Sequence, residues 1–113
     1  MGRATLKNGQ VVVADVRAAD TFWKKFRGLM WDDSLQPDEA LWFPGDNWIH
    51  CFFMKIPIDV LFLDKHGVIV YMKEKMKPWT ISPPVFRAKG VLECYPGTIE
   101  RHRLQVGQTI VIG

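Results

Sequence analysis

Hydrophobic and polar positions alternate along several short stretches of this chain, and this alternation predicts β-strands. Residues 10–17, QVVVADVR, are rich in β-branched side chains and follow the turn signal Asn8-Gly9. This arrangement is typical of a hairpin whose first strand is residues 3–7. Further stretches with strand character are residues 41–43, 48–54, 59–64, 68–73, 91–95 and 108–113.

Two stretches are typical of helices. Behind the cap candidates Asp20 and Thr21, apolar residues recur at helical spacing and predict an amphipathic helix of about three turns. The residues of this stripe are Phe22, Trp23, Phe26, Leu29 and Met30. Residues 96–104, PGTIERHRL, predict a short second helix, because Pro and Gly stand at its start. Residues 73–90 show neither period and are expected to form a long irregular segment.

These elements predict an α+β fold. We expect a single compact β-rich domain over residues 1–113, with an antiparallel, strongly curved or barrel-like sheet, one main helix and one short helix. At 113 residues and 48% hydrophobic composition, the chain is long enough to bury one core without cross-links.

The composition favours the cytoplasm. The N-terminal residues lack the apolar run of a signal peptide, and Lys55 and Asp59 interrupt the one stretch that approaches a membrane span. Cys51 and Cys94 stand far apart without a CxxC motif, so we expect two free, buried thiols. If the protein is exported, a disulfide between the two cysteines is the alternative.

The stretch 49–64, IHCFFMKIPIDVLFLD, contains ionisable residues where a plain core strand would be apolar. Strand alternation places Asp59 on one face with Leu61 and Leu63, while Glu93 lies in another apolar strand. Burying an unpaired carboxylate costs several kcal/mol, about 3 or more, so each carboxylate needs a cation or backbone donors.

Two interpretations satisfy this requirement. In the structural one, Asp59 accepts backbone N–H groups at the Pro57 turn, and Glu93 pairs with Arg27 or Lys55. In the functional one, six side chains converge on one pocket that binds an unknown small molecule or peptide, with residues 78–84 as a rim. Those six residues are Arg27, His50, Met54, Lys55, Asp59 and Glu93.

Other functions have weaker support in the sequence. An enzyme would use Asp59 and Glu93 as acid and base, and a nucleic-acid interface would use the basic residues after position 72, where seven Lys or Arg stand against three acidic residues. A solvated basic surface is the favoured interpretation of that charge. The three histidines lack paired ligand spacing and no phosphate-binding loop occurs, so we expect no metal and no cofactor. The oligomeric state stays open.

Three stretches carry a resemblance to a known family. FRGLM (26–30), FFMKIPIDVLFLD (52–64) and KGVLECYPGTIE (89–100) resemble, in order and spacing, the domain of unknown function 192 family. The resemblance implies a compact β-rich α+β domain found mostly in prokaryotes. It implies no established activity.

Overall fold

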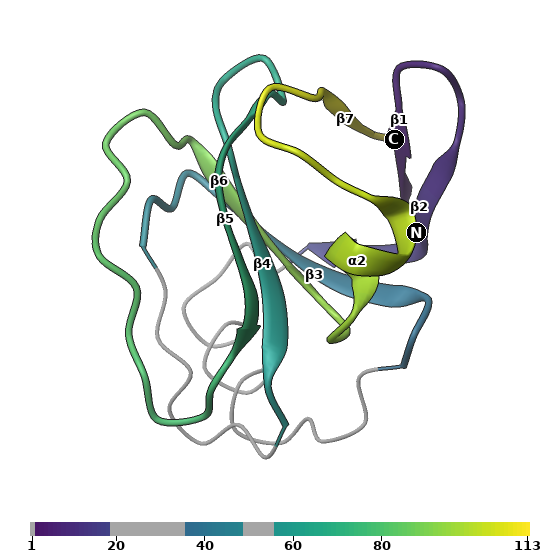
Figure 1. The fold of residues 1–113 in the computed structure, drawn as a ribbon. Helices are drawn as coiled ribbons and strands as arrows, with labels where there is room; N and C mark the ends of the chain where they lie inside the picture. The colour runs from purple at the N-terminus through teal and green to yellow at the C-terminus, as the bar shows by residue number, and fades with distance from the viewer. Residues whose placement is uncertain (1, 19–35, 49–55) are drawn as a thin grey trace.

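A computed structural model describes residues 2–18, 36–48 and 56–113 of the chain. Its strands form one sheet, whose order is β5-β4-β6-β3-β2-β1-β7 (Figure 1). The strands are β1 (Gly2–Leu6), β2 (Val11–Ala18), β3 (Glu39–Pro44), β4 (Ile58–Leu63), β5 (Ile69–Met76), β6 (Gly90–Cys94) and β7 (Ile110–Ile112), and the helix in the described residues is α2 (Thr98–His102).

The sheet is mixed, which corrects the expectation of an antiparallel sheet. Strand β2 runs parallel to β3, with Asp15 opposite Glu39 and Ala18 opposite Trp42. The other strand pairs are antiparallel, including the predicted β1–β2 hairpin. A parallel pair needs a crossover rather than a tight turn, and the twenty or so residues between β2 and β3 are sufficient for one.

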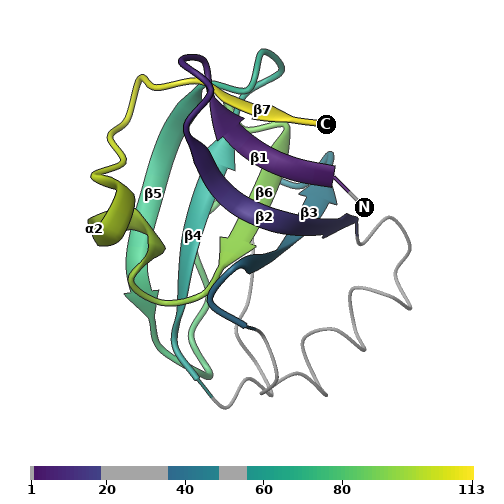
Figure 2. The ribbon, with the colours of Figure 1, turned by 90° about the vertical axis from the view of Figure 1, so that its right-hand side faces the viewer.

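The two ends of the sheet meet near the start of β5. The Ile69 N–H donates to the Gln108 carbonyl at 2.8 Å, and the Ile110 N–H donates to the Gly67 carbonyl at 2.8 Å. The sheet therefore curls into a half-barrel, with β1, β2 and β7 folded over β4 and β6 (Figure 2). Beyond Ile69, strand β5 pairs with β4 and with no other strand in the described residues.

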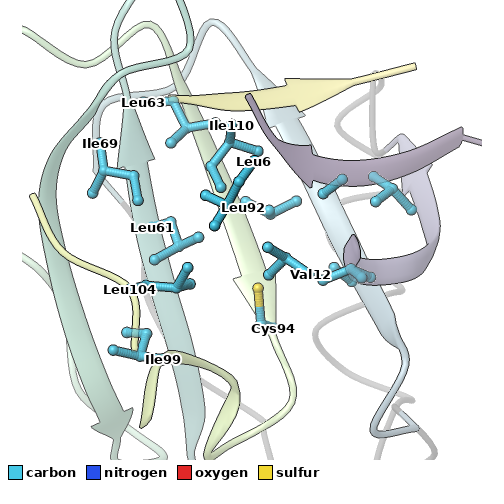
Figure 3. Packing of buried hydrophobic residues seen from close by; sticks show 14 residues of the cluster. Leu6, Val12, Leu61, Leu63, Ile69, Leu92, Cys94, Ile99, Leu104 and Ile110 are labelled. Atoms are coloured by element: carbon cyan, nitrogen blue, oxygen red, sulfur yellow. The ribbon is translucent and has the colours of Figure 1, made fainter. Parts of the chain in front are cut away.

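The concave face of the half-barrel holds the larger apolar cluster. Leu61 of β4, Leu92 of β6 and Leu104 after α2 point toward one another there (Figure 3). A second cluster, which includes Val60 and Phe62, occupies the other face of β4. The alternation predicted for residues 59–64 is thus confirmed, and each fully buried Leu, Val or Phe contributes about 2 kcal/mol to folding.

The helical predictions have different outcomes. The short helix is confirmed as α2, which begins after Gly97 in the left-handed conformation at φ 94°. The predicted main helix at residues 22–30 lies outside the described residues. The predicted irregular segment 73–90 is partly wrong, because β5 continues to Met76 and only residues 77–89 lack regular structure.

Gly67 is expected to be essential for closing the sheet. Its φ is +84°, and an added Cβ would lie 2.4 Å from the Ile110 carbonyl oxygen. Gly67→Ala should therefore lower the free energy of unfolding by about 2 kcal/mol or more, measured by denaturant unfolding. Gly9→Ala is the control, because Gly9 has φ +91° but open space around its Cα, and it should cost about 1 kcal/mol. Equal losses would contradict a steric role for Gly67.

Candidate functional site

Asp59 is fully buried and uses both carboxylate oxygens to bind backbone amides. Its Oδ1 accepts the Lys75 N–H of β5 at 2.8 Å. Its Oδ2 accepts the N–H groups of Gly97 at 3.1 Å and Ile99 at 2.9 Å, at the start of α2. A single side chain therefore joins β4 to the neighbouring strand and to the helix on the concave face.

The bond to Lys75 coincides with an irregularity in the sheet. Residues 58–60 of β4 stand opposite residues 73–76 of β5, so β5 carries one extra residue there. Lys75 adopts φ 48°, a left-handed conformation that is unusual for a side chain other than Gly. A bulge takes an amide out of the strand ladder, and the Asp59 carboxylate supplies the acceptor for that amide.

This geometry shows which donors bind the Asp59 carboxylate. The prediction that Asp59 accepts backbone N–H groups is confirmed, but the donors belong to the β5 bulge and to α2. The prediction that they belong to the Pro57 turn is wrong. The donors are distant in sequence from Asp59, so they could not be identified before the fold was known.

Glu93 is the second buried carboxylate, with 1% of its surface exposed. It lies in β6 between Leu41 of β3 and Val60 of β4. Neither of its carboxylate oxygens has a hydrogen-bond partner among the described residues. Burial, and to a smaller extent the charge of Asp46, raise the pKa of the Glu93 carboxyl well above its usual range.

The two carboxylates do not converge. Asp59 stands opposite Cys94, and Val60 stands opposite Glu93. Directly opposed residues in an antiparallel pair share a face, and neighbours along a strand take opposite faces. Asp59 and Glu93 therefore point to opposite sides of the sheet, so the expectation that they converge on one pocket is wrong, and so is the acid–base pair of the enzyme interpretation.

The other four predicted site residues, Arg27, His50, Met54 and Lys55, lie outside the described residues, as does Cys51. Cys94 is a free, buried thiol on the same face as Asp59. Burial, together with the charges of Asp59 and Glu93, raises the pKa of the Cys94 thiol, which makes it a poor nucleophile.

A hollow of about 480 Å³ lies between β5 and the segment that follows it. We call it the β5 groove. Strand residues 71 and 73–76 form one wall, and residues 77 and 80–83 form the other. The rim predicted at residues 78–84 thus lines a groove, but the groove contains neither Asp59 nor Glu93.

The charged residues of the β5 groove are mainly basic. Lys73, Lys75 and Lys77 line it, with Glu74 as their acidic neighbour. The sequence showed these lysines as part of a basic strip, but alternating lysines at the end of a strand do not by themselves indicate a groove. The position of the 80–83 segment beside them supplies the second wall.

No group of three or more His, Cys, Asp or Glu residues close enough to hold a metal ion occurs in residues 2–18, 36–48 and 56–113. Within the same ranges, no helix has the length and apolar character needed to cross a membrane.

Comparison with known protein sequences identifies one family. The model of the family of domain of unknown function 192, described as "Uncharacterized ACR", matches residues 4–112. A UPF0127 protein of Thermococcus sibiricus is 35% identical over 106 residues, which cover 90% of this chain and 68% of that protein. A UPF0127 protein of Pyrococcus furiosus is 34% identical over 108 residues, which cover 90% of each chain.

Comparison with solved structures confirms the fold. A proposed transcription regulator from Sinorhizobium meliloti 1021 superposes with a TM-score of 0.82 at 22% identity, over 98% of this chain and 91% of the other. A protein of unknown function from Novosphingobium aromaticivorans superposes with a TM-score of 0.79 at 20% identity, over 97% of this chain and 82% of the other. At these identities the likeness shows a shared architecture.

The buried contacts of Asp59 should make it important for stability. Asp59→Ala leaves three backbone donors without their acceptor, so we expect the free energy of unfolding to fall by about 2 to 4 kcal/mol in denaturant titrations. Asp64→Ala is the control, because Asp64 accepts the N–H groups of His66 and Val68 in a turn that is partly exposed, where water can replace the carboxylate. A loss no larger than that of Asp64→Ala would show that Asp59 does not hold β5 and α2.

Glu93 should make stability depend on pH. Because the pKa of Glu93 is raised in the folded state above its usual 4.5, the folded protein keeps a proton that the unfolded chain releases. The contribution of Glu93 to the free energy of unfolding is therefore fully present below pH 4.5. It is lost as the pH rises toward the folded-state pKa, by up to about 1.4 kcal/mol per pH unit. Glu93→Gln removes this dependence.

The measurement is the free energy of unfolding of both proteins from pH 4 to pH 8. Other titrating groups contribute equally to the two proteins and cancel in the difference. We expect the wild type to lose stability relative to Glu93→Gln as the pH rises. Parallel curves would mean that Glu93 titrates normally.

Proposed function

The chain belongs to the domain of unknown function 192 family, which is described as uncharacterized. Within this family, we propose that the protein is a binding or accessory domain rather than an enzyme. Its ligand site is the β5 groove, and its ligand is an extended polypeptide segment. The observation that carries this proposal is a groove beside a strand with no partner on its outer side in the described residues.

The size of the β5 groove supports a binding role. Its volume of about 480 Å³ falls within the range of about 300–1,000 Å³ that ligand sites occupy. The groove also combines two kinds of surface, because Ile81 and Pro83 offer apolar contacts while the lysines of β5 offer charge. Sites that fix the orientation of a ligand combine apolar walls with a few polar groups in this way.

The edge of β5 favours a polypeptide over a small molecule. Beyond Ile69, no described strand pairs with the outer side of β5, and no backbone hydrogen bond joins β5 to residues 77–83 in the described part of the chain. An outer strand edge presents N–H and C=O groups at regular spacing. An extended peptide can pair with those of the regular part of β5, before the bulge, by adding a strand to the sheet.

The positions of the buried carboxylates argue against the enzyme alternative. Asp59 is occupied by backbone amides and lies on the other face from Glu93. Neither carboxylate lines the β5 groove. The expectation that the protein works in the cytoplasm belongs to the same proposal and is supported by the free thiol of Cys94.

The experiment is selection of a displayed library of random twelve-residue peptides on the immobilised protein, followed by affinity measurements on the selected peptides. Ile81→Glu places a negative charge in the β5 groove, and Val106→Glu is a matched control away from it, because both residues are 58% exposed. We expect wild type and Val106→Glu to bind the selected peptides equally. Ile81→Glu should weaken binding about tenfold, the equivalent of about 1.4 kcal/mol.

Two results would contradict the proposal. The first is a library from which no peptide is enriched on the wild-type protein. The second is a set of enriched peptides that bind Ile81→Glu as tightly as wild type, because these peptides would occupy a different surface.

A further inference from the structure

The charge of the β5 groove identifies the kind of peptide that it fits. We infer that the partner is an acidic segment in extended conformation, which adds a strand to the outer edge of β5 with its carboxylates facing Lys73, Lys75 and Lys77. This inference rests on the proposed function and specifies the chemistry of the partner.

The lysines of the groove form no ion pair with the described residues. Lys73, Lys75 and Lys77 are exposed and line the groove together. The ion pair found among the described residues joins Arg17 to Glu39, so none of the three lysines takes part in one. Glu74 is the single acidic residue that lines the groove, so the groove has a net positive charge that a partner can neutralise.

The three lysines lie where β5 ends. Lys73 is in the regular part of the strand opposite Val60, Lys75 is in the bulge with φ 48°, and Lys77 follows the end of β5 at Met76. All three line the groove, so a partner that pairs along the regular part of β5 can bring its carboxylates near them. Opposite charges in cross-strand positions stabilise the pairing of two strands.

The other wall of the groove offers apolar contacts to the non-acidic residues of the partner. Ile81 and Pro83 lie there, and the side chain of Ile81 is 58% exposed. An apolar side chain of the partner that contacts Ile81 removes this exposed surface from water, which is favourable. The groove therefore fits a segment that contains both acidic and apolar residues.

The same lysines disfavour other occupants of the edge. Lysines on an outer strand are a common means of preventing association between sheets. A second copy of β5 would place lysines opposite lysines, which is destabilising. An acidic strand meets no such repulsion and is attracted by the lysines, so the charge of β5 favours it over basic strands.

The experiment measures binding of fluorescently labelled peptides to the full chain by anisotropy. The test peptide is four repeats of Glu-Val, and the comparison peptides are four repeats of Lys-Val and a Glu-Val peptide with alternate backbone nitrogens methylated. We expect the Glu-Val peptide to bind, with an affinity that falls as salt is added. The Lys-Val peptide and the methylated peptide should bind at least tenfold more weakly.

Two charge-reversal variants locate the interaction. Lys73→Glu should weaken binding of the Glu-Val peptide at least tenfold. Lys65→Glu makes the same change of charge in the exposed turn after β4, outside the groove, and should leave the affinity within about twofold of wild type. Equal effects of the two variants would overturn the inference.

The remaining outcomes separate this inference from the proposed function. Selected neutral or basic peptides that bind in the groove more tightly than the Glu-Val peptide would overturn the acidic partner and leave the groove proposal standing. A methylated peptide that binds as well as its parent would overturn strand addition. A random-sequence oligonucleotide that binds more tightly than the Glu-Val peptide, and depends on Lys73, would replace the acidic peptide with nucleic acid.

Discussion

The carboxylate of Asp59 is the interaction on which the described structure depends. It accepts one backbone amide from the β5 bulge and two from the start of α2. Without it, one buried and two partly buried backbone donors would be unsatisfied, and a buried donor that lacks its acceptor is costly. The same carboxylate accounts for the left-handed conformation of Lys75, a residue that lines the β5 groove. The shape of the groove therefore depends on a side chain that lies outside it.

Much of the fold could be predicted from local patterns. The β1–β2 hairpin follows from Asn8-Gly9 between strand-like stretches, and the two faces of β4 follow from alternation within residues 58–63. The short helix α2 follows from Pro96 and Gly97 at its start. The parallel pairing of β2 with β3 could not be predicted, because it depends on the path of the chain between them and not on any feature of either strand.

The candidate site was harder to predict, because it depends on strand register. The sequence correctly marked Asp59 and Glu93 as unusual buried charges, but a shift of one residue in the pairing of β4 with β6 reverses which face each side chain takes. In the observed register Asp59 stands opposite Cys94, which places Glu93 on the other face. The lysines of β5 were visible in the sequence, but the second wall of the groove is formed by the irregular residues 80–83, whose position no periodicity indicates.

The central claim is that the outer edge of β5 is an open position in the sheet that accepts another strand. Hydrogen exchange of the β5 amide protons, followed by nuclear magnetic resonance with and without a saturating peptide selected from the library, tests it most directly. The amide protons of residues 71–76 that point away from β4 should exchange rapidly in the free protein and slowly in the complex, while those of β4 should not change. Slow exchange of these protons in the free protein, or no change on saturation, would contradict the claim.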